Sequence, residues 1–262
     1  MNQDASTADR IRIVLVGTQH PGNIGAAARA IKTMGLARLV LVAPQRYPHN
    51  EADMMAAGAD DVLAAAVCVE TLAEALADCR LVLGCTARSR RVALEELSPR
   101  AAAGRVGEVA LAGGEVAVVF GRERTGLENE ELQLCHAAVH IPANPEYSSL
   151  NLAAAVQVLA YELRLVLLAA DAAPPVPADP GGHDETGHVE RTASHAQMEG
   201  LFEQLAQTLD DIDFHKGRAP ASAMRKLRRL FLRSDLRERE VRLLRGILAD
   251  AQRMARLASG RR

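Results

Sequence analysis

"IRIVLVGTQHPGNIGAAARAIKTMGLARLVLVAP", residues 11–44, contains two short apolar runs with a helical pattern between them. The runs are rich in Val, Leu and Ile, and Gly35 follows the helical pattern at the kind of position where helices commonly end. This order predicts one βαβ unit. Further apolar runs alternate with helical patterns at residues 79–86, 115–121 and 137–142. Because apolar strands that alternate with helices need cover on both sides, we expect an α/β fold with a parallel sheet and helices on both faces.

The chain changes character twice along its length. Residues 1–170 carry the α/β pattern, and residues 171–193 are rich in Pro, Gly and acidic residues, which is typical of a flexible linker. Residues 194–262 show helical periodicity and predict a small all-α C-terminal domain. This last part has 15 Lys and Arg against 9 Asp and Glu. Its positive charge favours a polyanionic partner such as RNA, although a solvated helix face with excess Arg is an equally plausible alternative.

Composition excludes several classes of protein. Aromatic residues make up only 3% of the chain, so base stacking on an aromatic platform is not expected. The four cysteines show no C-x-x-C spacing, which argues against a disulfide framework or a zinc site. We therefore expect that the protein binds no metal and lies in the reducing cytoplasm. The first ten residues contain no apolar segment, and Glu162 and Arg164 interrupt the most apolar run. We therefore expect neither a signal peptide nor a membrane span.

The first loop that is a candidate for binding or catalysis is "GTQHPGNIGAAARAIKTMG", residues 17–35. Its glycine spacing does not fit G-x-G-x-x-G, and Ala43 and Pro44 stand where a dehydrogenase would place a ribose-binding acid. Asn23 and Arg29 lie near the start of the predicted helix, where its dipole favours an anion. Two simpler roles remain open: Asn23 as a helix cap and Arg29 as a surface cation.

A second loop, "VVFGRERTGLENEEL" at residues 118–132, runs from a strand through a glycine-bearing turn into a helix. Gly121 and Gly126 permit a close backbone approach. Glu123 is either a general base or a partner for the neighbouring Arg122 and Arg124.

The third loop, "IPANPEYSSLN" at residues 141–151, is stiffened by two prolines and leads into a long apolar helix. Ser148, Ser149 and Asn151 cluster at the start of that helix. Since one such residue is enough to cap a helix, the surplus suggests that this loop presents backbone amides and a hydroxyl to a ligand.

Taken together and in this order, "NIGAAARAIKTMG", "FGRERTGL" and "IPANPEYSSLNLAAAVQ" resemble the three motifs of the SPOUT (TrmH-like) RNA 2'-O-ribose methyltransferases. The resemblance is strongest to the branch that methylates the ribose at position 32 of the tRNA anticodon loop, and it covers residues 10–168 closely. It implies a SPOUT-type sheet with a trefoil knot, a homodimer, tRNA as the substrate and S-adenosylmethionine as the cofactor. A ribosomal RNA methyltransferase of the same superfamily and a non-catalytic RNA-binding homologue are the alternatives, and the choice between cytidine and uridine stays open.

The resemblance also implies roles for particular residues. Arg29, Asn23 and Ser148 match the catalytic positions, with Arg29 expected to position the substrate and stabilise the developing alkoxide, and its use as a general base is the open alternative. The expected cofactor-binding residues are Thr86, Gly121, Glu123, Ile141, Ser149, Leu150 and Asn151. Two basic stretches are expected to contact RNA: Arg88, Arg90 and Arg91, and Arg225, Lys226, Arg228, Arg229 and Arg233. In the second stretch, we expect Leu227, Leu230 and Phe231 to face inward and the cations to face outward.

Overall fold

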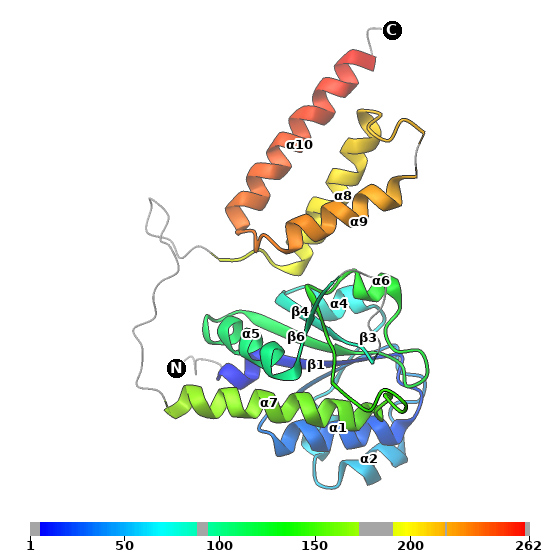
Figure 1. Cartoon of the computed structure of the whole chain (residues 1–262), viewed down its shortest axis with the longest axis vertical. Helices are drawn as coiled ribbons and strands as arrows, with labels where there is room; N and C mark the ends of the chain where they lie inside the picture. Colours follow the sequence, from blue (N-terminus) through cyan, green and yellow to red (C-terminus); the bar gives the residue numbers. More distant parts are fainter. Residues whose placement is uncertain (1–5, 88–93, 173–190, 218, 260–262) are drawn as a thin grey trace. The chain divides into compact units, whose positions relative to one another are not determined.

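The computed structural model describes residues 6–87, 94–172, 191–217 and 219–259 (Figure 1). The chain divides into two units, residues 1–176 and 177–262. The predicted linker, residues 171–193, lies mostly outside the described residues, as do the predicted RNA contacts Arg88, Arg90 and Arg91. The boundaries of the methyltransferase domain, the linker and the helical domain therefore stay predictions.

The first unit contains a seven-stranded sheet in which the paired strands are parallel. Its spatial order is β3-β2-β1-β6-β4-β7-β5. The strands are β1 (Ile11–Val16), β2 (Arg38–Val42), β3 (Val67–Val69), β4 (Cys79–Cys85), β5 (Glu95–Leu97), β6 (Glu115–Phe120) and β7 (Ala137–Val139). The five apolar runs correspond to β1, β2, β4, β6 and β7, which confirms the predicted parallel sheet.

The strands β3 and β5 have no counterpart among the predicted runs. Each has three residues and lies at one edge of the sheet, with two of its three side chains exposed. Because an edge strand of this length needs little apolar surface, it carries almost no periodic signal.

Helices cover both faces of the sheet, as the pattern predicted (Figure 1). Along β1, Ile11, Ile13 and Leu15 belong to the core that includes α1, α5 and α7, whereas Val14 and Val16 belong to the core that includes α4. This alternation follows from the two-residue period of a strand. The helical segments of the unit are η1 (Thr7–Arg10), α1 (Pro21–Thr33), α2 (Asn50–Ala56), α3 (Asp60–Ala64), α4 (Leu72–Leu76), α5 (Pro99–Leu111), α6 (Asn129–Leu132) and α7 (Leu152–Ala172).

Helix α7 is the only helix in the described part of the chain that is long and apolar enough to cross a membrane by length and composition. A core helix passes the same test, and α7 packs against α1 and α5 through Leu152, Val156, Leu159 and Leu163. Its other side leaves several large apolar side chains exposed, namely Tyr161, Leu165 and Leu168.

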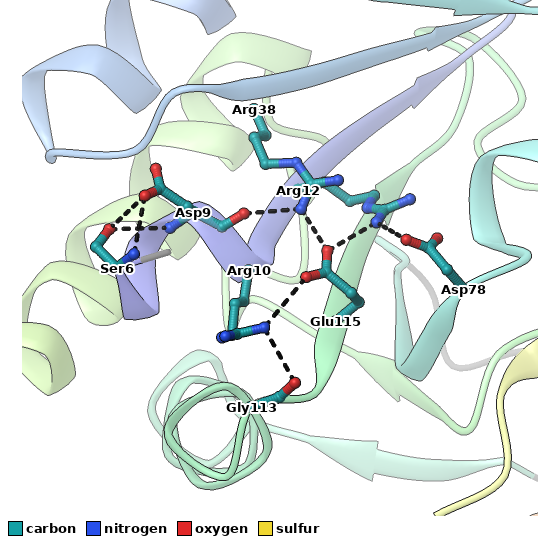
Figure 2. A network of polar contacts seen from close by, with 8 residues as sticks. All are labelled: Ser6, Asp9, Arg10, Arg12, Arg38, Asp78, Gly113 and Glu115. Carbon is teal, nitrogen blue, oxygen red and sulfur yellow. Dashed lines mark hydrogen bonds and ion pairs between the residues drawn. The ribbon is translucent and has the colours of Figure 1, made fainter. Parts of the chain in front are cut away.

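A network of ion pairs joins the amino ends of β1, β2 and β6 (Figure 2). The carboxylate of Glu115 accepts hydrogen bonds from Arg12, at 2.9 Å, and from Arg38. The Arg12 guanidinium also donates to Asp78 at 2.7 Å. Charged side chains therefore hold the strands together at the end of the sheet where they begin. The opposite end, where the strands finish and which we call the carboxyl edge, is left for the three loops.

The second unit consists of α8 (His195–Asp211), α9 (Pro220–Leu232) and α10 (Glu238–Ser259), which confirms the predicted helical C-terminal region. Its buried core includes Met198, Leu201, Phe202, Leu232 and Val241. The topology of the trefoil knot in the first unit stays a prediction.

The predicted orientation of α9 is wrong at two positions. Leu230 is 50% exposed, while the guanidinium of Arg228 lies 4.5 Å from the centre of the Phe202 ring and pairs with Glu199. Because the apolar stem of an arginine can cover a ring while its charged end finds a carboxylate, Arg228 faces inward, although periodicity assigned it to the outer face.

Candidate active site

A cavity of about 420 Å³ lies at the carboxyl edge of the sheet. The strands β6, β4 and β7 are neighbours in the sheet, and the loops that follow them line this cavity. Residues that the sequence assigned to the cofactor line it as well: Thr86, Gly121, Glu123, Ile141, Ser149 and Leu150. The predicted catalytic residue Ser148 lines the same cavity. The remaining three predicted site residues, Asn151, Asn23 and Arg29, do not line it.

The turn after β6 is closed tightly by its two ends. The backbone amide of Arg122 donates to the carbonyl of Gly126 at 3.2 Å, and the amide of Gly126 donates back at 2.8 Å. A Cβ atom on Gly121 would lie 2.1 Å from the carbonyl carbon of Gly126, so no other residue fits there without moving the backbone. Gly126 itself has φ of +69°, which glycine adopts without strain.

Glu123 binds the start of α1. Its carboxylate accepts hydrogen bonds from the backbone amides of Gln19 and His20 and from the side-chain amide of Asn23, each at 3.0 Å. Although partial burial opposes ionisation, these donors hold the pKa of Glu123 below its usual value. The carboxylate is therefore charged at neutral pH and occupied by donors, which favours a fixed structural acceptor over a general base.

Glu123 is not the partner of Arg122, which was one of the open alternatives. The Arg122 guanidinium instead forms a pair with Glu131, with both oxygens at 3.0 Å, and lies 3.5 Å from Glu128. The Arg122 side chain also packs under Gly17, whose φ is +58°. The second loop is thus tied both to α6 and to the loop after β1.

Asn23 and Asn151 bridge the first and third loops. The side-chain amide of Asn151 donates to Oδ1 of Asn23 at 2.9 Å, and its own Oδ1 accepts from the amide of Ala153 at 2.9 Å. Asn151 therefore caps α7. Asn23 is not a cap, because α1 begins at Pro21 and His20 holds the capping position. A continuous chain of hydrogen bonds, Glu123 to Asn23 to Asn151, joins the three loops.

Arg29 lies in the third turn of α1 with its side chain exposed. Within the described part of the chain, its guanidinium forms no hydrogen bond or ion pair. It does not line the cavity of its own chain.

Sequence reasoning missed several residues that line the cavity, among them Phe120, Arg124 and Leu152. Phe120 and Leu152 form part of its apolar wall, and sequence alone assigned them only to a strand and a helix. Arg124 was considered only as a partner of Glu123. Among the described residues, no group of three His, Cys, Asp or Glu side chains is placed to hold a metal ion.

Comparisons with known proteins match both units. Residues 10–161 match the SpoU rRNA Methylase family, and residues 196–260 match the C-terminal domain of the tRNA methyltransferase TrmJ. The tRNA (cytidine/uridine/adenosine-2'-O-)-methyltransferase TrmJ of Pseudomonas aeruginosa (strain UCBPP-PA14) is 49% identical over 255 residues, covering 97% of this chain and 98% of that protein. The tRNA (cytidine/uridine-2'-O-)-methyltransferase TrmJ of Salmonella typhimurium is 48% identical, covering 92% and 96%. The crystal structure of TrmJ from Z. mobilis ZM4 superposes with a TM-score of 0.76 at 35% identity, covering 91% and 97%.

Proposed function

Because this chain belongs to the SpoU methylase family, we propose that it methylates a ribose 2'-hydroxyl of tRNA, at position 32 of the anticodon loop, with S-adenosylmethionine as the methyl donor. The protein is a methyltransferase, and its relatives over nearly the whole chain are named tRNA 2'-O-methyltransferases. The match of residues 196–260 to a tRNA methyltransferase domain favours tRNA over ribosomal RNA. We also infer that the protein acts in the cytoplasm, where a tRNA substrate is found and where its four free cysteines are stable as thiols.

The observation that carries this proposal is the cavity at the carboxyl edge of the sheet. Its volume of about 420 Å³ is within the range of small-molecule sites. Gly121 lines this cavity, and because it has no Cβ the turn after β6 can close against Gly126 and remain part of the cavity wall. These features fit S-adenosylmethionine, which Thr86, Gly121, Ile141, Ser149 and Leu150 would hold.

Bound in this cavity, the cofactor would supply an electrophilic methyl group on a sulfonium. The residues of the chain have to align the ribose hydroxyl and to stabilise the oxygen as its proton leaves. Ser148 lines the cavity and can donate a hydrogen bond to the ribose. Arg29 carries a guanidinium with several hydrogen-bond donors and no acceptor, so we assign it to binding the ribose or its phosphate and to stabilising the developing alkoxide.

We infer that the protein acts as a homodimer. The exposed side of α7 carries Tyr161, Leu165 and Leu168, and a second chain would remove this apolar surface from water. The position of Arg29 outside the cavity of its own chain also supports a site that a second chain completes. Sedimentation equilibrium that gave only a monomer at micromolar concentration would contradict this inference.

The proposed catalytic role predicts the behaviour of Arg29→Ala. Loss of one group that stabilises a developing oxyanion slows turnover by about 100-fold or more, while cofactor binding should be unchanged because Arg29 does not line the cavity. Methyl transfer to purified tRNA and calorimetric titration with S-adenosylmethionine measure the two effects. Lys32→Ala, which removes another exposed cation from the same helix, is the matched control. Normal turnover by Arg29→Ala would remove this residue from the mechanism.

The substrate is tested in cells that lack the protein. We expect mass spectrometry of their tRNA to show unmethylated ribose at position 32, and expression of the wild-type chain to restore the modification. Loss of a 2'-O-methyl group from ribosomal RNA instead would overturn the tRNA assignment.

A further inference from the structure

Among the described residues, four charged side chains line the cavity, and three of them have hydrogen-bond or ion-pair partners within the fold. These are Arg122, which pairs with Glu131 and Glu128, Glu128 itself, and Glu123, which accepts from Asn23 and two backbone amides. The fourth is Arg124, whose side chain is exposed. Within the described part of the chain, its guanidinium makes no hydrogen bond or ion pair. Among the described residues, the cavity rim therefore carries one cation that the fold does not use.

The backbone beneath Arg124 is held firmly although its side chain is not. Arg124 is the central residue of the turn that the paired backbone bonds between Arg122 and Gly126 close. The side chains of both preceding residues are anchored, that of Arg122 on Glu131 and that of Glu123 on the start of α1. An unpaired guanidinium is suited to a ligand that carries a negative charge. Because the backbone that holds it is already ordered, little conformational entropy is lost when the ligand binds.

We propose that Arg124 binds an oxyanion at the rim of the cavity, either the carboxylate of the cofactor's methionine part or a phosphodiester of the substrate RNA. This inference rests on the proposed function. Both groups present two oxygens in the geometry that a guanidinium fork recognises, and arginine stays charged in either setting. The neutral amide and hydroxyl groups of the third loop cannot supply that charge. Arg124 is accordingly a binding residue, and the anion it takes decides whether it serves the cofactor or the substrate.

Arg124→Ala and Arg124→Lys distinguish the two sources. Titration with S-adenosylmethionine in the absence of RNA measures the first, and tRNA affinity over a range of salt concentrations measures the second. If the anion is the carboxylate, Arg124→Ala weakens cofactor binding about tenfold and leaves the salt dependence of tRNA binding unchanged. If it is a phosphodiester, tRNA affinity falls about tenfold and the slope of log affinity against log salt decreases by about 1. Arg124→Lys should keep most of that slope, because it keeps the charge.

The matched control is Arg100→Ala, which removes a cation whose side chain is 80% exposed from another part of the same unit. It should change neither affinity, and both variants should keep the wild-type melting temperature. The inference is overturned if Arg124→Ala binds cofactor and tRNA within twofold of a wild-type enzyme that is active, or if its only effect is a lower melting temperature. A wild-type chain that fails to methylate tRNA would overturn the proposed function itself, and this inference with it.

Discussion

At the scale of single residues, Glu123 shows how one carboxylate organises a site without acting on the substrate. It receives donors from the loop after β1 and, through Asn23, is linked to Asn151 at the start of α7. The three loops of the cavity therefore share one hydrogen-bonded chain. Because each of these three side chains hydrogen-bonds to the next, replacing one of them leaves a donor or acceptor without its partner in another loop.

Glu123→Gln keeps the shape of the side chain and removes its charge. Since the folded pKa of Glu123 lies below its ordinary value, its charge stabilises the fold above about pH 4.3, and this contribution is lost as the pH falls through the folded pKa. We expect the variant to be less stable by about 1–2 kcal/mol at pH 7, with the difference shrinking below about pH 4. Urea unfolding of the variant and the wild type at pH 7 and below about pH 4 measures this difference in stability. Glu96→Gln removes an exposed carboxylate as the control, and a gap that does not change with pH would refute the assignment.

At the scale of the elements, the sequence indicates strands well but not their neighbours. The apolar runs predicted five of the seven strands and their parallel arrangement, and because parallel strands share one direction, the loops that follow them lie at one end of the sheet. Arg12 and Glu115 are 103 residues apart, and their contact depends on β1 lying next to β6. The pattern of runs leaves that order open, so the pairing could not be predicted.

The network at the amino edge predicts unequal effects of two similar substitutions (Figure 2). Glu115→Gln deprives the guanidinium of Arg12, whose side chain is only 7% exposed, of the less exposed of its two carboxylate partners, and should cost about 3 kcal/mol of unfolding free energy. Asp78→Asn removes a carboxylate that is 58% exposed and should cost less than about 1 kcal/mol. Urea unfolding of the full chain compares them. Equal losses for the two variants would mean that burial does not control the strength of this network.

At the scale of the whole molecule, charge and periodicity predicted a helical, basic second unit but not which of its cations are free. Periodicity places leucines inside and arginines outside, and α9 breaks this rule where Arg228 covers Phe202 and pairs with Glu199. In the same way, sequence placed Arg29 near the start of α1, but the rotation of the helix about its axis, which depends on tertiary packing, put it outside the cavity. Side-chain direction is the part of the site that a motif alone does not determine.

The structure therefore divides the basic stretch of α9 into two kinds of residue. Arg225 and Lys226 are exposed, so the double variant Arg225→Ala/Lys226→Ala should weaken tRNA binding about tenfold and lower the salt slope by about 2, with no change in melting temperature. Arg228, whose side chain is 16% exposed, holds α9 against α8, so Arg228→Ala should destabilise the second unit by about 1–2 kcal/mol. Thermal unfolding and tRNA titration of both variants separate the two roles, since a cation that binds RNA changes the salt slope and a cation that packs changes the melting temperature. The division is wrong if Arg228→Ala melts like the wild type while losing as much tRNA affinity as the double variant.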